Sequence, residues 1–224
     1  MTKISIYTLT MGRWKYLRDL IDSISYDETI EHFIVYQGVK PPEYITELTH
    51  RNKITNIFLE ENIGIAAAMN QILPILSGDI VIKFDDDAKI ISKDFFQHVR
   101  EIHKLNPNLV FSPYPVGLIN NPGGVPSRNH SVIYSEDSNQ YYTLRYVHHI
   151  GGFARISPGF TKNWVFENDL IPGISGNEDS QHSQKCLNQN IQMAYLENAI
   201  IVEHNESSLG QHARYGEEYF KGRF

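Results

Sequence analysis

Three consecutive aspartates, Asp85, Asp86 and Asp87, are the residues of this sequence best suited to bind a metal ion. They follow residues 80–84, a mostly apolar run that is typical of a buried strand. In an extended chain, residues i and i+2 project to the same side, so Asp85 and Asp87 would face one edge and Asp86 would point elsewhere. Adjacent carboxylates repel each other unless a cation lies between them, and oxygen ligands suit Mg²⁺ or Mn²⁺. An acidic turn exposed to water is the alternative.

A second acidic pair, Glu178 and Asp179, stands at the start of a predicted helix over residues 177–190. A carboxylate within hydrogen-bond reach of a hydroxyl group can remove its proton as a general base. The alternative is structural, because acidic residues in the first turn favour the helix dipole and Asn177 is a good N-cap.

Strands and helices alternate through the first half of the chain. Apolar and β-branched runs predict strands, and apolar residues spaced by three and four predict helices. The strands are expected at residues 3–9, 31–36, 53–59 and 79–84, and the helices at 13–24, 42–50 and 62–76. This order predicts an α/β fold with a mostly parallel sheet sandwiched by helices. Ligands of such sheets bind at the carboxyl ends of the strands, which places residues 9–10, 36–38, 61–62 and 85–87 on one rim.

The second half has a looser pattern, and we see no repeat or domain boundary in it. We therefore expect a single domain over residues 1–224. Its elements are expected as helices at 94–105 and 177–190, strands at 109–114, 141–150 and 193–203, and a long loop or hairpin at 117–139.

Composition narrows the function classes. The 224 residues include 41% hydrophobic and 21% charged residues, which is ordinary for a globular protein. A net charge of -6 argues against a nucleic-acid partner. The single cysteine, Cys186, cannot form an internal disulfide and fits a reducing compartment. No apolar run is long enough for a transmembrane segment, and the start lacks the pattern of a secretory signal. These features predict a cytoplasmic protein, free or peripheral at a membrane.

Three segments, residues 3–10, 62–70 and 78–87, together resemble the family 2 glycosyltransferases of the GT-A fold. They match a first strand, an Asn-x-Gly with a downstream Asn, and a Gly-Asp leading through an apolar strand to Asp-x-Asp. The similarity resumes at residues 151–155 and 176–179. It implies a GT-A fold and metal-dependent transfer of a sugar from a nucleotide-diphosphate sugar to an acceptor hydroxyl, with inversion. The nucleotide-binding half would be residues 1–92, and the acceptor-side half residues 93–224.

The resemblance also implies a role for individual residues. Asp85 would contact the ribose or the metal, and Asp87 would coordinate Mn²⁺ or Mg²⁺. His204, at the end of the last predicted strand, would be a further metal ligand, with His212 as a rival. Asp179 would be the general base, supported by Glu178. The remaining donor-binding positions would be Thr8, Thr10, Asn62, Gly64, Asn70, Asp86 and Gly152.

One departure from the family concerns the nucleobase. Many relatives carry Asp after the second strand, whereas this chain has Tyr36 and Gln37, which could stack on a base or hydrogen-bond to it. The donor nucleotide is therefore open. The acceptor is expected to be a glycan, a lipid-linked molecule or a protein.

Rival functions remain at this point. One is a non-catalytic module that binds a nucleotide sugar or glycan, and another is a phage-type enzyme acting on modified DNA. A nucleotidyltransferase would carry a Gly-rich loop after its first strand, where this chain has Gly12 alone.

Overall fold

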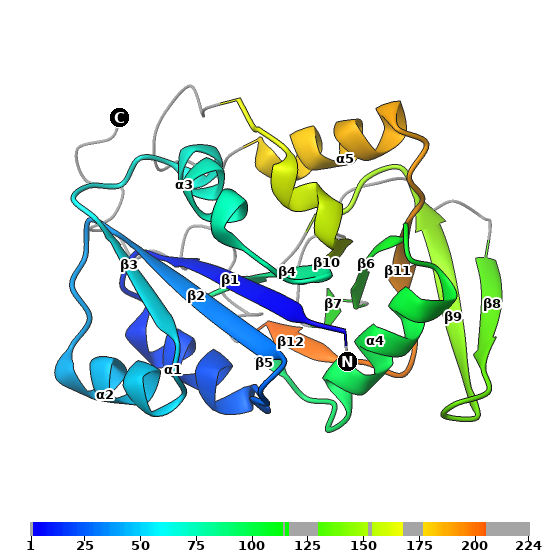
Figure 1. Ribbon diagram of the computed structural model, residues 1–224, viewed down its shortest axis with the longest axis horizontal. Helices are drawn as coiled ribbons and strands as arrows, with labels where there is room; N and C mark the ends of the chain where they lie inside the picture. Colours follow the sequence, from blue (N-terminus) through cyan, green and yellow to red (C-terminus); the bar gives the residue numbers. More distant parts are fainter. Residues whose placement is uncertain (1, 114, 117–129, 152–153, 168–176, 205–224) are drawn as a thin grey trace.

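The computed structural model describes residues 2–113, 115–116, 130–151, 154–167 and 177–204 (Figure 1). Its centre is a nine-stranded sheet in the order β3-β2-β1-β4-β10-β6-β11-β9-β8. In that order the strands are β3 (Thr55–Leu59), β2 (Ile30–Gln37), β1 (Ile4–Thr10), β4 (Ile80–Asp85), β10 (Ala154–Pro158), β6 (Val110–Pro113), β11 (Met193–Leu196), β9 (Gln140–Val147) and β8 (His130–Ser135). A small second sheet joins β5 (Ala88–Ile90), β12 (Val202–His204) and β7 (Pro115–Val116).

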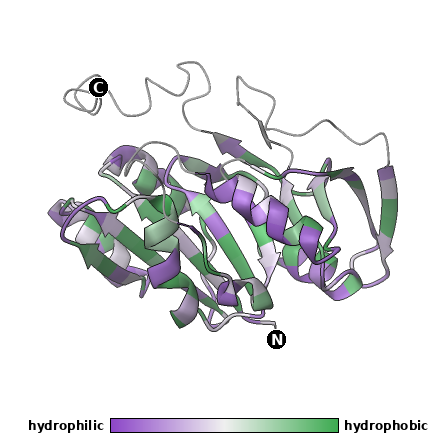
Figure 2. Cartoon of the chain, turned by 90° about the horizontal axis from the view of Figure 1, so that it is seen from above, coloured by the Kyte–Doolittle hydropathy of each residue, from purple (hydrophilic) through white to green (hydrophobic). Residues whose placement is uncertain are grey.

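Helices cover both faces of the main sheet, as Figure 1 shows. On one face lie α3 (Ile65–Ile72) and α5 (Glu178–Asn188), and on the other α1 (Trp14–Ser23), α2 (Glu43–Arg51) and α4 (Phe95–Leu105). Two 3₁₀ turns, η1 (Leu73–Ile75) and η2 (Gly159–Asn163), complete the elements. The strands are hydrophobic and the outer sides of the helices hydrophilic (Figure 2), as expected when one stripe of each helix packs on a sheet.

The predicted α/β fold is confirmed, with a mixed, largely parallel central sheet. Strands β3, β2, β1 and β4 are parallel neighbours, and β6 pairs in parallel with β11. Strand β10, which the sequence did not predict, runs antiparallel between β4 and β6. It is buried throughout yet contains Arg155 and Ser157, so it lacks the apolar run by which a central strand is recognised.

Two predicted elements were wrong in extent. The final strand over residues 193–203 is two strands in different sheets, because Ala199 adopts a positive φ of 71° and the chain turns there. The helix over residues 62–76 begins only at Ile65. Gly64, with φ of 90°, forms its N-cap, and a 3₁₀ turn containing Pro74 follows its last turn.

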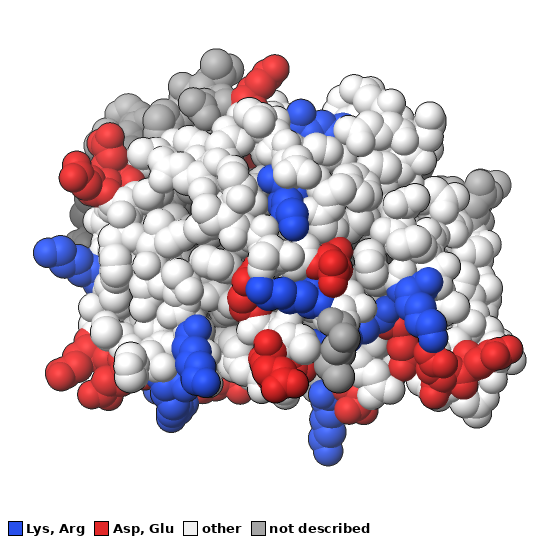
Figure 3. All heavy atoms as spheres, in the orientation of Figure 1, with Lys and Arg blue, Asp and Glu red and all other residues white. Residues whose placement is uncertain are grey.

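Two surface properties bear on partners. Within the described residues, every helix is too short or too polar to span a bilayer. On the face drawn in Figure 3, basic and acidic side chains are interspersed along the lower part of the molecule rather than separated by sign.

Gly78 fixes the start of β4 against β1. Its amide donates to Ser5 Oγ at 2.7 Å, and a Cβ at this position would lie 2.5 Å from the backbone nitrogen of Ser5. We predict that Gly78→Ala lowers the free energy of unfolding by about 1–3 kcal/mol, because the backbone must shift to relieve the overlap. Urea denaturation measures this change, and an unaltered midpoint would contradict the packing described.

Candidate active site

The three consecutive aspartates lie at the end of β4. Asp85 is the last residue of β4, whereas Asp86 and Asp87 form the turn that leads into β5. The expectation that Asp85 and Asp87 share one side and Asp86 points elsewhere was therefore wrong, because the chain is not extended beyond Asp85. Asp86 and Asp87 instead contact the same guanidinium group, and Asp85 contacts a different cation.

Arg13, just after β1, neutralises the turn. Its Nη1 lies 2.5 Å from Asp87 Oδ2, and its Nη2 contacts Asp86 Oδ1. Thr10 Oγ1 donates to the other oxygen of Asp86 at 2.6 Å. Burial raises the pKa of Asp86, and the Arg13 guanidinium opposes that rise. The side chain of Thr10, predicted to be donor-binding, thus supports the acidic turn.

Lys83 connects the end of β4 with the first turn of α5. Its Nζ lies 3.2 Å from Asp85 Oδ1, 3.3 Å from Glu178 Oε1 and 3.8 Å from Asp179 Oδ1. Burial alone would lower the pKa of Lys83, but the carboxylates of Asp179, Asp85 and Glu178 hold it well above its usual value. The lysine is therefore a fixed positive charge at the junction of the two acidic groups predicted from the sequence.

The two acids of α5 differ in their surroundings. Glu178 is buried, and burial together with the negative charge of Asp179 raises the pKa of its carboxyl. Asp179 has a side chain that is 24% exposed and accepts a hydrogen bond from Arg155 Nη1. A Cβ on Gly151 would lie 3.3 Å from Asp179 Oδ2, so the glycine keeps space free beside that oxygen. Of the two, Asp179 has the access to solvent that a base needs.

Tyr36 and Gln37, the two residues expected at the nucleobase, have different surroundings. Tyr36 is fully buried among residues of α1 and α2, and its ring stacks on Phe58 at 4.9 Å, so the expectation that it stacks on a base was wrong. Gln37 faces the opposite side of β2 and is 4% exposed, and its Oε1 has no hydrogen-bond partner within the described residues. A buried acceptor of this kind usually has a partner, which a nucleobase could supply.

Comparison with known protein families shows to which family the chain belongs. The family model for glycosyl transferase family 2 matches residues 5–161, well over half of the sequence. The chain belongs to glycosyl transferase family 2. No curated protein matches the sequence.

Solved structures of several glycosyltransferases share the fold. GalNAc-T7 with UDP, GalNAc and Mn²⁺ superposes with a TM-score of 0.67 at 12% identity, over 91% of this chain and 43% of that one. S. aureus TarS in complex with UDP-GlcNAc superposes with a TM-score of 0.65 at 16% identity, over 98% of this chain and 64% of that one. The mannosyltransferase PcManGT from Pyrobaculum calidifontis, in complex with GDP-Man and Mn²⁺, superposes with a TM-score of 0.64 at 13% identity, over 95% of this chain and 59% of that one. The chain thus spans less than two thirds of each of these structures.

The Asn-x-Gly segment, residues 62–64, forms the loop between β3 and α3. Asn62 Oδ1 accepts from the amide of Gly64 at 3.0 Å, and Asn62 Nδ2 contacts Met11 Sδ at 3.5 Å. The two residues thus fix the local shape of the loop, and a role near the nucleotide remains a prediction. Thr8 differs, since its hydroxyl lies in the core 3.2 Å from His32 Nε2, which leaves only its backbone for the predicted role.

Asn70, the downstream Asn of the motif, has a structural role that the donor-binding prediction missed. Its Nδ2 donates to the carbonyl of Phe166 at 2.7 Å, and its Oδ1 accepts from the amide of Phe166 at 2.8 Å. Both ends of the amide are thereby used in fixing the segment after η2. The expectation that Asn70 binds the donor is corrected accordingly.

We predict that Asn70→Ala lowers the free energy of unfolding by about 1–3 kcal/mol, because the backbone groups of Phe166 lose their partners. Nucleotide affinity should remain within twofold of wild type. Denaturation and isothermal titration measure the two quantities, and a large loss of affinity without loss of stability would restore the donor-binding role.

The side chains expected to bind the metal are of the chemical types that bind divalent ions. Carboxylate oxygens and an imidazole suit Mn²⁺. In the register of β12 with β5, His204 lies opposite Ala88, the residue after Asp87. The side chain of His204 lies outside the described residues, as does Gly152. Across the described parts of the chain, no three His, Cys, Asp or Glu side chains gather into a metal site. A bound ion would compete with Arg13 for Asp87.

Arg13 and Lys83 contact the acids of the candidate site, and sequence reasoning overlooked both. A signal for Lys83 was present, because a lysine within an apolar central strand must be paired with acids. Arg13 gave no such signal, since it stands at the start of a predicted amphipathic helix, where an arginine is ordinary.

Proposed function

We propose that this chain transfers a sugar from a nucleotide-diphosphate sugar to an acceptor hydroxyl group, with a divalent cation. The observation that carries the proposal is the meeting of Asp85 with Glu178 and Asp179 at Lys83 Nζ. It brings the end of β4 next to Asp179, which is the more exposed of the two acids at the start of α5. The nucleotides, nucleotide sugar and Mn²⁺ named for the three related structures are consistent with it.

The donor would lie along the carboxyl ends of β1, β2 and β4. Gln37 would hydrogen-bond to the nucleobase through its buried Oε1, and Asp85 would contact the ribose. Asp87 and His204 would hold Mn²⁺ or Mg²⁺, which supplies positive charge to stabilise the leaving diphosphate. Residues 1–92 would thus form the nucleotide half and residues 93–224 the acceptor half.

Asp179 would act as the general base. Its carboxylate would take the proton of the acceptor hydroxyl as that oxygen attacks the anomeric carbon and the diphosphate leaves. Attack from the face opposite the leaving group would invert the anomeric centre. Glu178, whose pKa is raised by burial, would support Asp179 from the interior. A glycan, lipid-linked molecule or protein is the proposed acceptor class, and a cytoplasmic location suits a nucleotide-sugar donor.

Thermal unfolding with a panel of nucleotides tests the donor side directly. UDP, GDP, CMP, dTDP and their sugar conjugates would each be added with Mn²⁺, Mg²⁺ or EDTA. A ligand at about 100 times its dissociation constant stabilises the fold by about 2.7 kcal/mol. We expect one nucleotide diphosphate to raise the melting temperature, and EDTA to abolish the rise. No shift with any nucleotide would count against the transferase.

A paired variant assigns the shift to the base pocket. Gln37→Leu should reduce the shift, because it removes an amide whose hydrogen bond is worth about 0.5–1.5 kcal/mol and leaves a side chain of similar volume. Gln184→Leu, at an exposed position on α5, serves as the control.

A further inference from the structure

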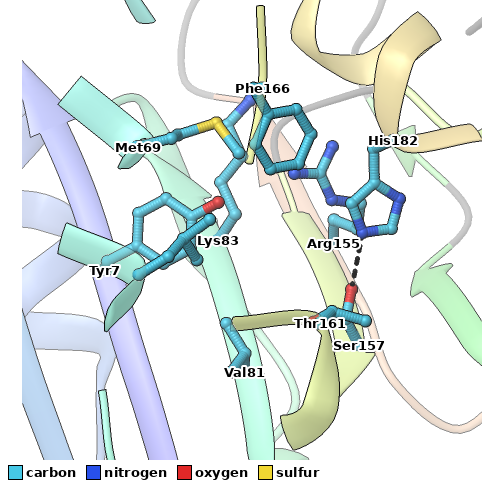
Figure 4. A pocket seen from close by; sticks show the side chains of 10 residues that line it. Tyr7, Met69, Val81, Lys83, Arg155, Ser157, Thr161, Phe166 and His182 are labelled. Carbon is cyan, nitrogen blue, oxygen red and sulfur yellow. Dashed lines mark hydrogen bonds between the residues drawn. The ribbon is translucent and has the colours of Figure 1, made fainter. Parts of the chain in front are cut away.

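Two buried, positively charged side chains lie next to each other on adjacent strands of the main sheet. Tyr7 of β1, Lys83 of β4 and Arg155 of β10 are direct cross-strand partners, so their side chains project to the same side of the sheet. Figure 4 shows this row next to Phe166 and His182. Arg155 and Lys83 are 3% and 5% exposed, and Tyr7 is 1% exposed.

Burying two neighbouring positive charges is by itself unfavourable to the stability of the fold. Like charges directly opposite each other in adjacent strands repel, and each buried cation loses its hydration. His182 adds no third charge, because burial holds its pKa well below the usual value. Three acids compensate the two cations, namely Asp85 and the pair Glu178 and Asp179. Apolar residues in place of buried ion pairs are often neutral or stabilising. Stability is therefore a poor explanation for two paired cations at these positions.

The ion pairs instead fix the start of α5. Asn177, the residue before the helix, makes no side-chain capping hydrogen bond. The first turn is held by Arg155 on Asp179 and by Lys83 on Glu178. One turn further on, Ser183 Oγ accepts from the amide of Ile150 at 3.1 Å.

Arg155 is itself restrained. Its guanidinium is buried and is held by the carboxylate of Asp179, which ties β10 to α5. Lys83 reaches Asp85 as well as both acids of α5. The spacing between the strand end at Asp85 and the carboxylate of Asp179 thus depends on two side chains of fixed charge.

We infer that Lys83 and Arg155 are positioning residues for Asp179, which set its carboxylate relative to the donor site. The inference rests on the proposed function, in which Asp179 is the base. Neither residue needs to touch the sugar, because each acts through the carboxylates that it holds.

A double-mutant cycle between Arg155 and Asp179 tests the inference. In the wild-type background, Arg155→Met should lower kcat by about 10- to 100-fold, because a displacement of about 1 Å of a catalytic group costs that much. The KM for the donor should change by less than about threefold, since the donor contacts remain. In the Asp179→Asn background, the same substitution should have little further effect, because the group it positions is no longer a base.

The conservative variants complete the test. Arg155→Lys and Lys83→Arg keep the charge and should retain more kcat than Arg155→Met and Lys83→Met, and they serve where a Met variant fails to fold. Additive losses in the cycle, or a rise in donor KM at constant kcat, would overturn the inference and make Arg155 a donor contact or a purely structural residue. These results differ from failure of the proposed function, in which wild-type protein itself shows no transfer and both ideas fall.

Discussion

Asp179→Asn is expected to lower kcat for sugar transfer by about 10²–10⁴-fold, the usual contribution of a general base. The substitution keeps the shape of the side chain and removes its ability to take a proton. Nucleotide binding should persist, because the residues proposed to bind the base, ribose and metal are on other elements. Steady-state kinetics and thermal shifts with nucleotide measure the two effects separately.

Asp137→Asn provides a matched control. Asp137 is an exposed aspartate whose carboxylate pairs with Lys104 at 2.6 Å, far from α5 in the sequence. It should leave kcat unchanged. If Asp179→Asn also retained full turnover, Asp179 would not be the base, and the structural reading of an acid that favours the helix dipole would stand. A non-catalytic binding module would be equally indifferent to both substitutions.

The elements of the first 84 residues were predictable because their signals are local. Alternation of apolar strands and amphipathic helices up to Phe84 is set by which residues face the core, and burial confirms it. The carboxylates of Asp85 and Asp179 were also identifiable, since acids at a strand end and at a helix start are visible in the sequence. Their proximity was not, because it depends on Lys83 and on contacts more than ninety residues apart.

Side-chain direction was the main source of error. Tyr36 and Gln37 are neighbours on β2, and the pleat alone decides that Tyr36 packs against α1 and α2 while Gln37 faces the opposite side of the sheet. Asn70 fits a sequence motif, yet its amide is used by Phe166, a residue that no local pattern brings to it. At Asp87 the turn after β4 replaced the extended geometry on which the i, i+2 argument relied.

Arg13→Met is expected to lower the free energy of unfolding by about 3–5 kcal/mol in the absence of divalent ions. The substitution removes the guanidinium that contacts the buried carboxylates of Asp86 and Asp87, while its apolar stem is largely replaced. Urea denaturation in EDTA measures the loss. Arg18→Met is the matched control, because Arg18 is 55% exposed and its ion pair with Asp22 spans 4.0 Å, so its removal should cost little.

The same variant tests whether a cation and Arg13 compete for one place. If Mn²⁺ binds at Asp87, it should restore much of the stability of Arg13→Met and stabilise this variant more than the wild type, in which the ion must first displace the guanidinium. Melting temperatures across an Mn²⁺ titration give the comparison. Equal shifts in both proteins would mean that the ion binds without disturbing Arg13. No shift in either would remove Asp87 as a metal ligand, and Arg13 would then be the positive charge of the acidic turn.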